Sequence, residues 1–272
     1  ESRIRSFGVS VAGSGAVAVG ALIGANVITN SVISQISAST VISGGTLDLS
    51  ATTDSEILSM TAGVAASTVS VFVSLSANVV TNTTEALITN DGSTSSFVDA
   101  GDAVSLSAQD SSTIDALAIG VSAGGGAVGI GLGASVIANT IKTAVEGSTL
   151  ETDNSLSLDS QSSAIIRTLS LGVSGGGFAV QVTAMGNAVA NTVTSSITDS
   201  EVYAGGAVSL YAADTAPSSI PKWILPQDTS DDLNESLEDS PIDLDANILA
   251  VMVSVAGGGG AACRISSWPR RY

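Results

Sequence analysis

GANVITN at residues 24–30 has three close counterparts along the chain: SANVVTN at 76–82, GASVIANT at 133–140 and GNAVANT at 186–192. Each counterpart carries an asparagine at the same place, and the four are 52, 57 and 52 residues apart: Asn30, Asn82, Asn139 and Asn191. A segment that returns at a nearly constant interval is typical of repeat architectures, in which each unit packs mainly on its neighbours. The interval therefore points to a repeat fold.

A second series of motifs fixes the length of the repeat. TLDLSA at 46–51 recurs as AVSLSA at 103–108, SLSLDS at 155–160 and AVSLYA at 207–212, at intervals of 57, 52 and 52 residues. Both series place the extra residues in the second unit, at the turn-like stretch NDGSTSS, 90–96. The period is thus 52 residues, and residues 1–214 divide into the units 2–54, 55–110, 111–161 and 162–214, with a partial fifth repeat at 245–262.

The composition of the repeats favours strands. Val, Ile and Thr dominate, Gly interrupts often, and Leu, Glu and Lys are scarce. A helix through GVSGGG at 172–177 would lose about 1 kcal/mol per glycine. In residues 16–30 both sets of alternating side chains are largely apolar, so we expect strands that are buried on both faces. The sequence predicts an all-β chain.

The interval predicts a β-solenoid in the form of a parallel β-helix, in which equivalent side chains stack above one another. We expect each 52-residue unit to span two coils. Four such units, at about 4.8 Å per coil, would stand about 40 Å tall. The terminal coils would expose unpaired strand edges, which predicts self-association through the ends of the solenoid.

The repeated asparagines are predicted to form a structural ladder whose amides hydrogen-bond along the stack. Because they recur at one phase of the repeat, this role is favoured over ligand binding for all four: Asn30, Asn82, Asn139 and Asn191. Two G-x-S-x-G strings, around Ser122 and Ser174, also share one phase of the repeat. The chain has no histidine to serve as their base, so we assign them no catalysis.

The overall composition excludes several classes of protein. The 272 residues carry a formal net charge of −17, which argues against nucleic-acid binding. There is no His and only one Cys, so imidazole-based catalysis, imidazole metal sites and a disulfide framework are excluded. We therefore predict a non-enzymatic protein without a cofactor. The sequence opens on Glu1 with no secretory signal, and we interpret it as a mature product or an excerpt of a longer chain.

Two segments depart from the repeat. Residues 215–244 hold four of the five prolines and a concentration of carboxylates, and we expect a solvated excursion from the solenoid. The alternative is a calcium loop, although EF-hand spacing and the GGxGxD nonapeptide are both missing. Its candidate ligands are Asp228, Asp231, Asp232 and Glu235. Residues 263–272 form an atypical basic tail.

A membrane-spanning helix is the rival interpretation of residues 6–47, which contain no charge. The string from Gly20 to Gly24 matches the small-xxx-small pattern of helix pairs in membranes. However, Asn26, Asn30 and many Ser and Thr residues interrupt the segment, and no run of about 20 purely apolar residues exists. We therefore expect no membrane span.

The units resemble a known family of repeats. Sequences of the form GVSVAGSGAVAVGALIGANVITNSV (8–32) followed by SGGTLDLSATTD (43–54) are similar to repeats of very large bacterial surface and secreted proteins. These are the filamentous-haemagglutinin-like and autotransporter adhesins, with leukotoxin-like relatives. The resemblance covers residues 2–214 and 245–262.

This resemblance implies export by a Gram-negative type V route and display at the cell surface. It also implies a structural or adhesive role without catalysis, with a host or cell-surface receptor or glycan as the partner. Two alternatives stay open at this point. One is a self-assembling extracellular fibre or matrix subunit, and the other is a carbohydrate-active β-helix enzyme.

Overall fold

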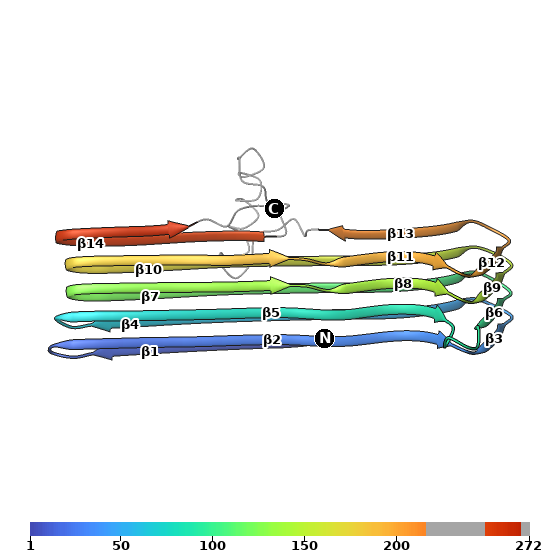
Figure 1. The fold of residues 1–272 in the computed structure, drawn as a ribbon, viewed down its shortest axis with the longest axis horizontal. Coiled ribbons are helices and arrows are strands. Elements are labelled where there is room, and N and C mark those ends of the chain that lie inside the picture. The colour runs from blue at the N-terminus through green and yellow to red at the C-terminus, as the bar shows by residue number, and fades with distance from the viewer. Residues whose placement is uncertain (216–247, 268–272) are drawn as a thin grey trace, which may run out of the picture.

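A computed structural model of the chain describes residues 1–215 and 248–267, with side chains as far as residue 258. Every regular element in these residues is a β-strand (Figure 1), so the all-β prediction is confirmed. The strands are β1 (Ser2–Gly13), β2 (Val17–Ser37), β3 (Thr40–Ser43), β4 (Leu47–Ala66), β5 (Val69–Thr89), β6 (Phe97–Ala100), β7 (Val104–Ile137), β8 (Thr140–Glu146), β9 (Thr149–Thr152), β10 (Leu156–Val189), β11 (Thr192–Thr198), β12 (Glu201–Ala204), β13 (Val208–Thr215) and β14 (Ile248–Ser267).

Residues 6–47, the segment for which a membrane helix was the rival interpretation, belong to strands and their turns. Among the described residues no helix has the length and hydropathy needed to cross a membrane. The dense Val, Ile and Thr content explains this outcome, because β-branched side chains fit the pleated surface of a strand better than a helix.

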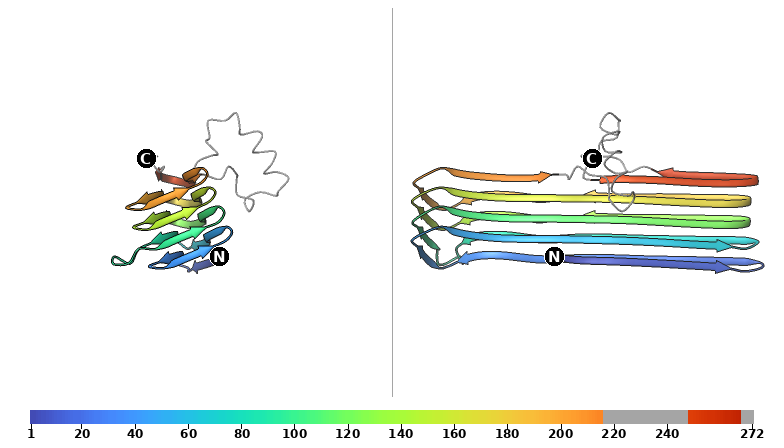
Figure 2. Two further views of the ribbon diagram at one scale, coloured as in Figure 1. Left: turned by 90° about the vertical axis from the view of Figure 1, so that its right-hand side faces the viewer. Right: turned by 180° about the vertical axis from the view of Figure 1, so that it is seen from behind.

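The chain runs back and forth in flat layers, as Figures 1 and 2 show. In one layer β4 leads to a tight turn at 67–68, β5 returns beside it, and the short β6 closes the circuit. We call the first long segment of each layer its outgoing arm and the second its return arm. The outgoing arms are 2–13, 47–66, 104–123, 156–176 and, in the fifth layer, 208–215 together with 248–258; the return arms are 17–37, 69–89, 126–146 and 178–198. The short strands β3, β6, β9 and β12 form a sheet of their own.

Every strand pair is parallel and joins residues at nearly constant intervals. Val17 pairs with Val69 and Leu156 with Val104, both 52 residues apart, whereas Leu47 pairs with Val104 at an interval of 57. The expectation of two coils per 52 residues is therefore wrong, since one interval carries the chain once round the layer. Five layers about 4.8 Å apart measure about 20 Å along the stack, half the height expected.

The two irregular intervals have visible causes. The interval of 57 arises at loop 90–96, where the Asp91 carboxylate accepts the N–H groups of Ser93 (2.9 Å) and Thr94 (2.7 Å). These bonds lower the pKa of Asp91. At the other end, Ile166 pairs with Ile248, an interval of 82 residues, because the acidic insertion between β13 and β14 adds 30 residues to the usual interval of 52. Most of that insertion lies outside the described residues.

An apolar core fills the end of each layer that the short strands close. Leu49, Leu106 and Leu158 stack on the outgoing arms and meet Ile88 and Val145 of the return arms. A smaller cluster around Ile57, Ile114 and Ile137 lies farther along the arms. Together these clusters hold the two arms against each other over that half of their length, in the manner of packed sheets.

Glycines make room for Phe72, a large buried side chain in the other half of the interior. Phe72 is 1% exposed and points from β5 between the arms. A Cβ at Gly20 would come within 2.8 Å of the Phe72 ring, and a Cβ at Gly63 would overlap the ring outright. Because Gly63 has no side chain, the aromatic ring can occupy the space beside its Cα.

The prediction of strands buried on both faces is wrong for 16–30. The even-numbered residues face the interior, but the other face is open: Val19 is 67% exposed, Ile23 75% and Val27 61%. Within the described residues no second sheet covers this face, because each return arm packs only on its own outgoing arm and on the layers above and below.

Gly63→Ala should destabilise the protein by about 1–3 kcal/mol, because the added methyl overpacks the space held by the Phe72 ring. Gly24→Ala is the matched control, since a Cβ there meets nothing within 4 Å. Urea unfolding of both variants measures the difference. Equal stability of the two variants would contradict this account, and adding Phe72→Leu to Gly63→Ala should recover part of the loss.

Candidate functional site

The four asparagines singled out by the repeat lie on successive return arms and face the interior. The backbone N–H of Asn82 donates to Oδ1 of Asn139 (2.8 Å), and the backbone N–H of Asn139 donates to Oδ1 of Asn191 (3.0 Å). Asn30, on the first return arm, donates through Nδ2 to the Ser55 hydroxyl on the outgoing arm of the next layer (3.0 Å). The bonds between successive asparagines thus run from backbone to side chain rather than from amide to amide.

An interruption of the strands explains this pattern. β7 ends at Ile137 and β8 begins at Thr140, and β10 and β11 leave the same gap one layer on. A buried N–H that loses its ladder partner needs another acceptor, and the asparagine oxygen of the next layer supplies it. A direct amide pair occurs nearby, where Asn26 Nδ2 donates to Asn78 Oδ1 (2.8 Å).

The asparagine amides surround a buried carboxylate that the sequence analysis did not single out. Asp110, 3% exposed, accepts bonds from Nδ2 of Asn82 (2.8 Å), Nδ2 of Asn139 (2.6 Å) and the Ser112 hydroxyl (2.8 Å). Burial raises the pKa of Asp110, the three donors oppose this shift, and the nearby charge of Asp54 adds to it. The donors that surround the group all favour its charged form.

A polar groove of about 330 Å³ lies beside this cluster. Two outward columns of the outgoing arms contribute to it: Thr52, Gln109 and Gln161 in register, and Asp54, Ser111 and Ser163 in register, with Thr215 beyond. The lining offers hydroxyls, carboxamides and the two carboxylates of Asp54 and Asp110, but no cation. Such a surface suits a polar, uncharged ligand with many hydroxyl groups rather than an anion.

The serines of the G-x-S-x-G strings and two of the cations have partners within the fold. Ser122 and Ser174, the serines of the two G-x-S-x-G strings, are 1% exposed and bond to each other inside the stack (2.9 Å). Arg167 holds Asp115 of the neighbouring layer through two bonds (2.6 and 2.8 Å), and Lys142 holds Glu146 (2.7 Å). Each of these side chains thus has its partner within the fold.

The calcium candidates Asp228, Asp231, Asp232 and Glu235 lie outside the described residues, as does the end of the basic tail, 268–272. Within the residues that the structure describes, no three Asp, Glu or Cys side chains come together in a way that could hold a metal ion. In the described part of the chain, the polar side chains to consider as a functional site are therefore those of the groove and of the Asp110 cluster.

Comparison of the chain with family models, with curated proteins and with solved structures finds no match.

Asp110→Asn should alter the pH dependence of stability. Because burial raises the pKa of this carboxyl in the folded state, its contribution is fully present below its unfolded pKa, about 3.9, and is lost as pH rises through the folded value. The variant has no titratable carboxyl at position 110. Its Nδ2 amide group would face the Nδ2 amide group of Asn82, but this contact is the same at every pH. The free energy of unfolding of the variant relative to wild type should therefore rise from pH 4 towards neutrality.

Urea unfolding at a series of pH values measures this difference. Asp159→Asn is the control, since it removes a half-buried carboxylate from the outward face of β10. Parallel pH curves for wild type and Asp110→Asn would contradict the assignment of a raised pKa to Asp110.

Proposed function

We propose that the chain is a β-solenoid segment of an adhesin-like protein on the outer surface of a Gram-negative bacterium, where it acts as a non-enzymatic stalk. The observation that supports this most is the long parallel pairing between layers. β10 pairs with β7 from Leu156↔Val104 to Val189↔Ile137, along the outgoing and the return arm alike, with one irregularity near Gly176. The filamentous-haemagglutinin-like repeats that the units resemble give the same expectation.

The pairing suits a mechanical role because its bonds act together. A backbone hydrogen bond contributes only about 1 kcal/mol net, but each layer is held to the next along two long arms and a short side. The described chain enters in the first layer and reaches its last strand in the fifth (Figure 1). A pull on the two ends would therefore have to separate layer from layer.

The partners of the polar side chains support a role without catalysis. The buried serine pair Ser122–Ser174 and the ion-paired Lys142 and Arg167 are satisfied within the fold. A catalytic group has to keep a reactive atom free for its substrate.

Adhesion needs a contact surface, and we assign it to the polar groove of the outgoing arms. Gln109 and Gln161 stand one layer apart, and their carboxamides can donate and accept hydrogen bonds. Tyr211, 52% exposed, lies on the same outward face of β13 and offers an apolar platform to a sugar ring. The ligand class is therefore a neutral cell-surface glycan.

A second candidate, the self-assembling fibre subunit, has its own support. Within the described residues β1 pairs only with β4 and β2 only with β5, so each leaves one edge unpaired. An open parallel edge can accept a further layer from another chain. Filaments that lengthen with protein concentration in electron micrographs would favour this candidate over the stalk.

Pulling the described chain by its two ends should release it layer by layer. Each step should free one 52-residue circuit, a gain in contour length of about 170–190 Å. Single-molecule force spectroscopy measures both the step length and the force. A single step that releases the whole stack, or unfolding without a measurable force peak, would contradict the proposed stalk.

Gln109→Ala combined with Gln161→Ala should weaken retention of the protein on immobilised neutral polysaccharides at least about tenfold, since two bonds to the ligand disappear. Ser105→Ala combined with Ser157→Ala is the matched control, as these residues are paired across the same two layers but lie outside the groove. If both double variants bind like wild type, the groove is not the adhesive surface.

A further inference from the structure

The return arms carry an apolar surface that no part of the described chain covers. We call it the apolar plate and define it as every second residue of 17–27, 69–79, 126–136 and 178–188, counted from the first. Each of these outward residues is Val, Ile, Leu, Phe, Ala or Gly. The strand register aligns them in columns, such as Ile23, Leu75, Leu132 and Ala184.

The plate is open to its surroundings. Val19 is 67% exposed, Ile23 75% and Phe178 52%, and in the inner layers Leu132 is still 40% exposed. Monomeric proteins rarely expose contiguous apolar patches larger than about 300–600 Å². A single exposed valine is normal on a protein surface, but a continuous apolar surface over four layers requires an explanation.

The interior behind the plate is polar, the reverse of an ordinary sheet. Ser122 bonds to Ser174 (2.9 Å), Ser174 donates to Gln181 (2.7 Å), and Gln181 donates to Thr183 (3.4 Å), all buried between the arms. Asn26 and Asn78 are joined in the same way (2.8 Å). The strands thus place their hydrogen-bonding side chains inside and their large aliphatic side chains outside. The part of the chain that the structure describes leaves these aliphatic side chains exposed.

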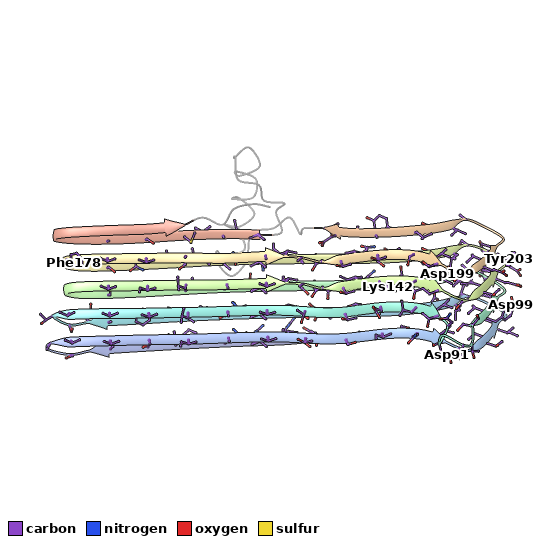
Figure 3. The ribbon with its side chains drawn as sticks, in the orientation of Figure 1. Asp91, Asp99, Lys142, Phe178, Asp199 and Tyr203 are labelled. Atoms are coloured by element: carbon purple, nitrogen blue, oxygen red, sulfur yellow. The ribbon has the colours of Figure 1, made fainter. Side chains whose placement is uncertain are left out.

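The return arms that carry the plate contain no charged residue along its length. Segments 57–84, 116–141 and 168–198 contain no Asp, Glu, Lys or Arg, although the chain carries a net charge of −17. In Figure 3, Asp91, Asp99 and Asp199 lie at the end with the short strands, whereas Phe178 lies at the opposite end. Two copies of so acidic a chain can therefore approach each other through the plate with little repulsion between charges.

The area of the plate matches what a stable pair of proteins needs. Eleven to twelve residues along a strand and four strands across measure about 40 Å by about 19 Å, or about 800 Å². A standard protein–protein interface buries about 800 Å² on each partner. Flat sheets with aliphatic faces pack at about 10 Å, as in sandwich folds.

We propose that the apolar plate is the interface for a second copy of this chain, packed return arm against return arm. A self-complementary patch of this kind forms a closed, two-fold pair. The contact is lateral and leaves the strand edges at the ends of the stack untouched. Lipid is a less suitable cover, because the open edges of β1 and β2 would bring unpaired backbone groups into the hydrocarbon.

The test compares the oligomeric state of wild type with that of Leu75→Lys/Leu132→Lys, which places two charges in one column of the plate. Sedimentation velocity across a concentration series should show a dimer of wild type with a dissociation constant of about micromolar or below. The lysine variant should be a monomer, or a dimer at least about tenfold weaker. Ser105→Lys/Ser157→Lys, paired on the opposite outward face, is the matched control and should dimerise like wild type.

Two further measurements keep the result decisive. Circular dichroism must show the same β-signal in each variant, and Leu75→Thr/Leu132→Thr, which keeps a high strand propensity, should also weaken the dimer if the lysine variant fails to fold. A wild-type monomer at all concentrations, or assembly that the plate substitutions leave unchanged, would overturn the proposal. So would a monomer that binds vesicles of neutral phosphatidylcholine and loses this binding in the lysine variant.

Discussion

The structure depends on one constraint, the in-register parallel pairing of each layer with the next. Because of this pairing, equivalent residues of successive layers stand in one column, about 4.8 Å apart. Each side chain must therefore be compatible with the side chain at the equivalent position in the next layer. Small hydroxyl and amide side chains satisfy one another in such columns, as Ser122 and Ser174 do. A charged column would repel itself, and the ion pair of Arg167 with Asp115 is therefore built from opposite charges in adjacent layers.

The same constraint divides each layer into two unlike halves. Near the short strands, leucine columns such as Leu49, Leu106 and Leu158 form a core of the usual kind. Towards the tight turns, the interior holds polar columns, and it admits Phe72 only where glycines on the facing arm make space. The hydrophobic effect thus stabilises one half of the layer directly, whereas hydrogen bonds between columns stabilise the interior of the other half.

The strands and the interval between paired residues could be predicted from the sequence, because both are properties of local composition and of the repeated motifs. Two predictions were wrong, the number of coils per repeat and the burial of both strand faces, because the sequence pattern specifies neither. A period of 52 residues does not say how many times the chain goes round, and an apolar alternate face does not say that something covers it. Asp110 could have been found, since it occupies the inward phase of Leu106 and Ala108. Its two amide donors could not, because Asn82 and Asn139 lie on return arms, 28 and 29 residues away along the chain.

The groove and the apolar plate lie on opposite outward faces of the layer, and this placement determines how they can be combined. The groove belongs to the outgoing arms, through Gln109 and Gln161, and the plate belongs to the return arms, through Leu75 and Leu132. Two copies joined at their plates would therefore keep both grooves facing outward, so pairing would not compete with glycan contact. It would instead present two grooves per assembly, and two weak contacts on one rigid body bind a surface far more strongly than either contact alone.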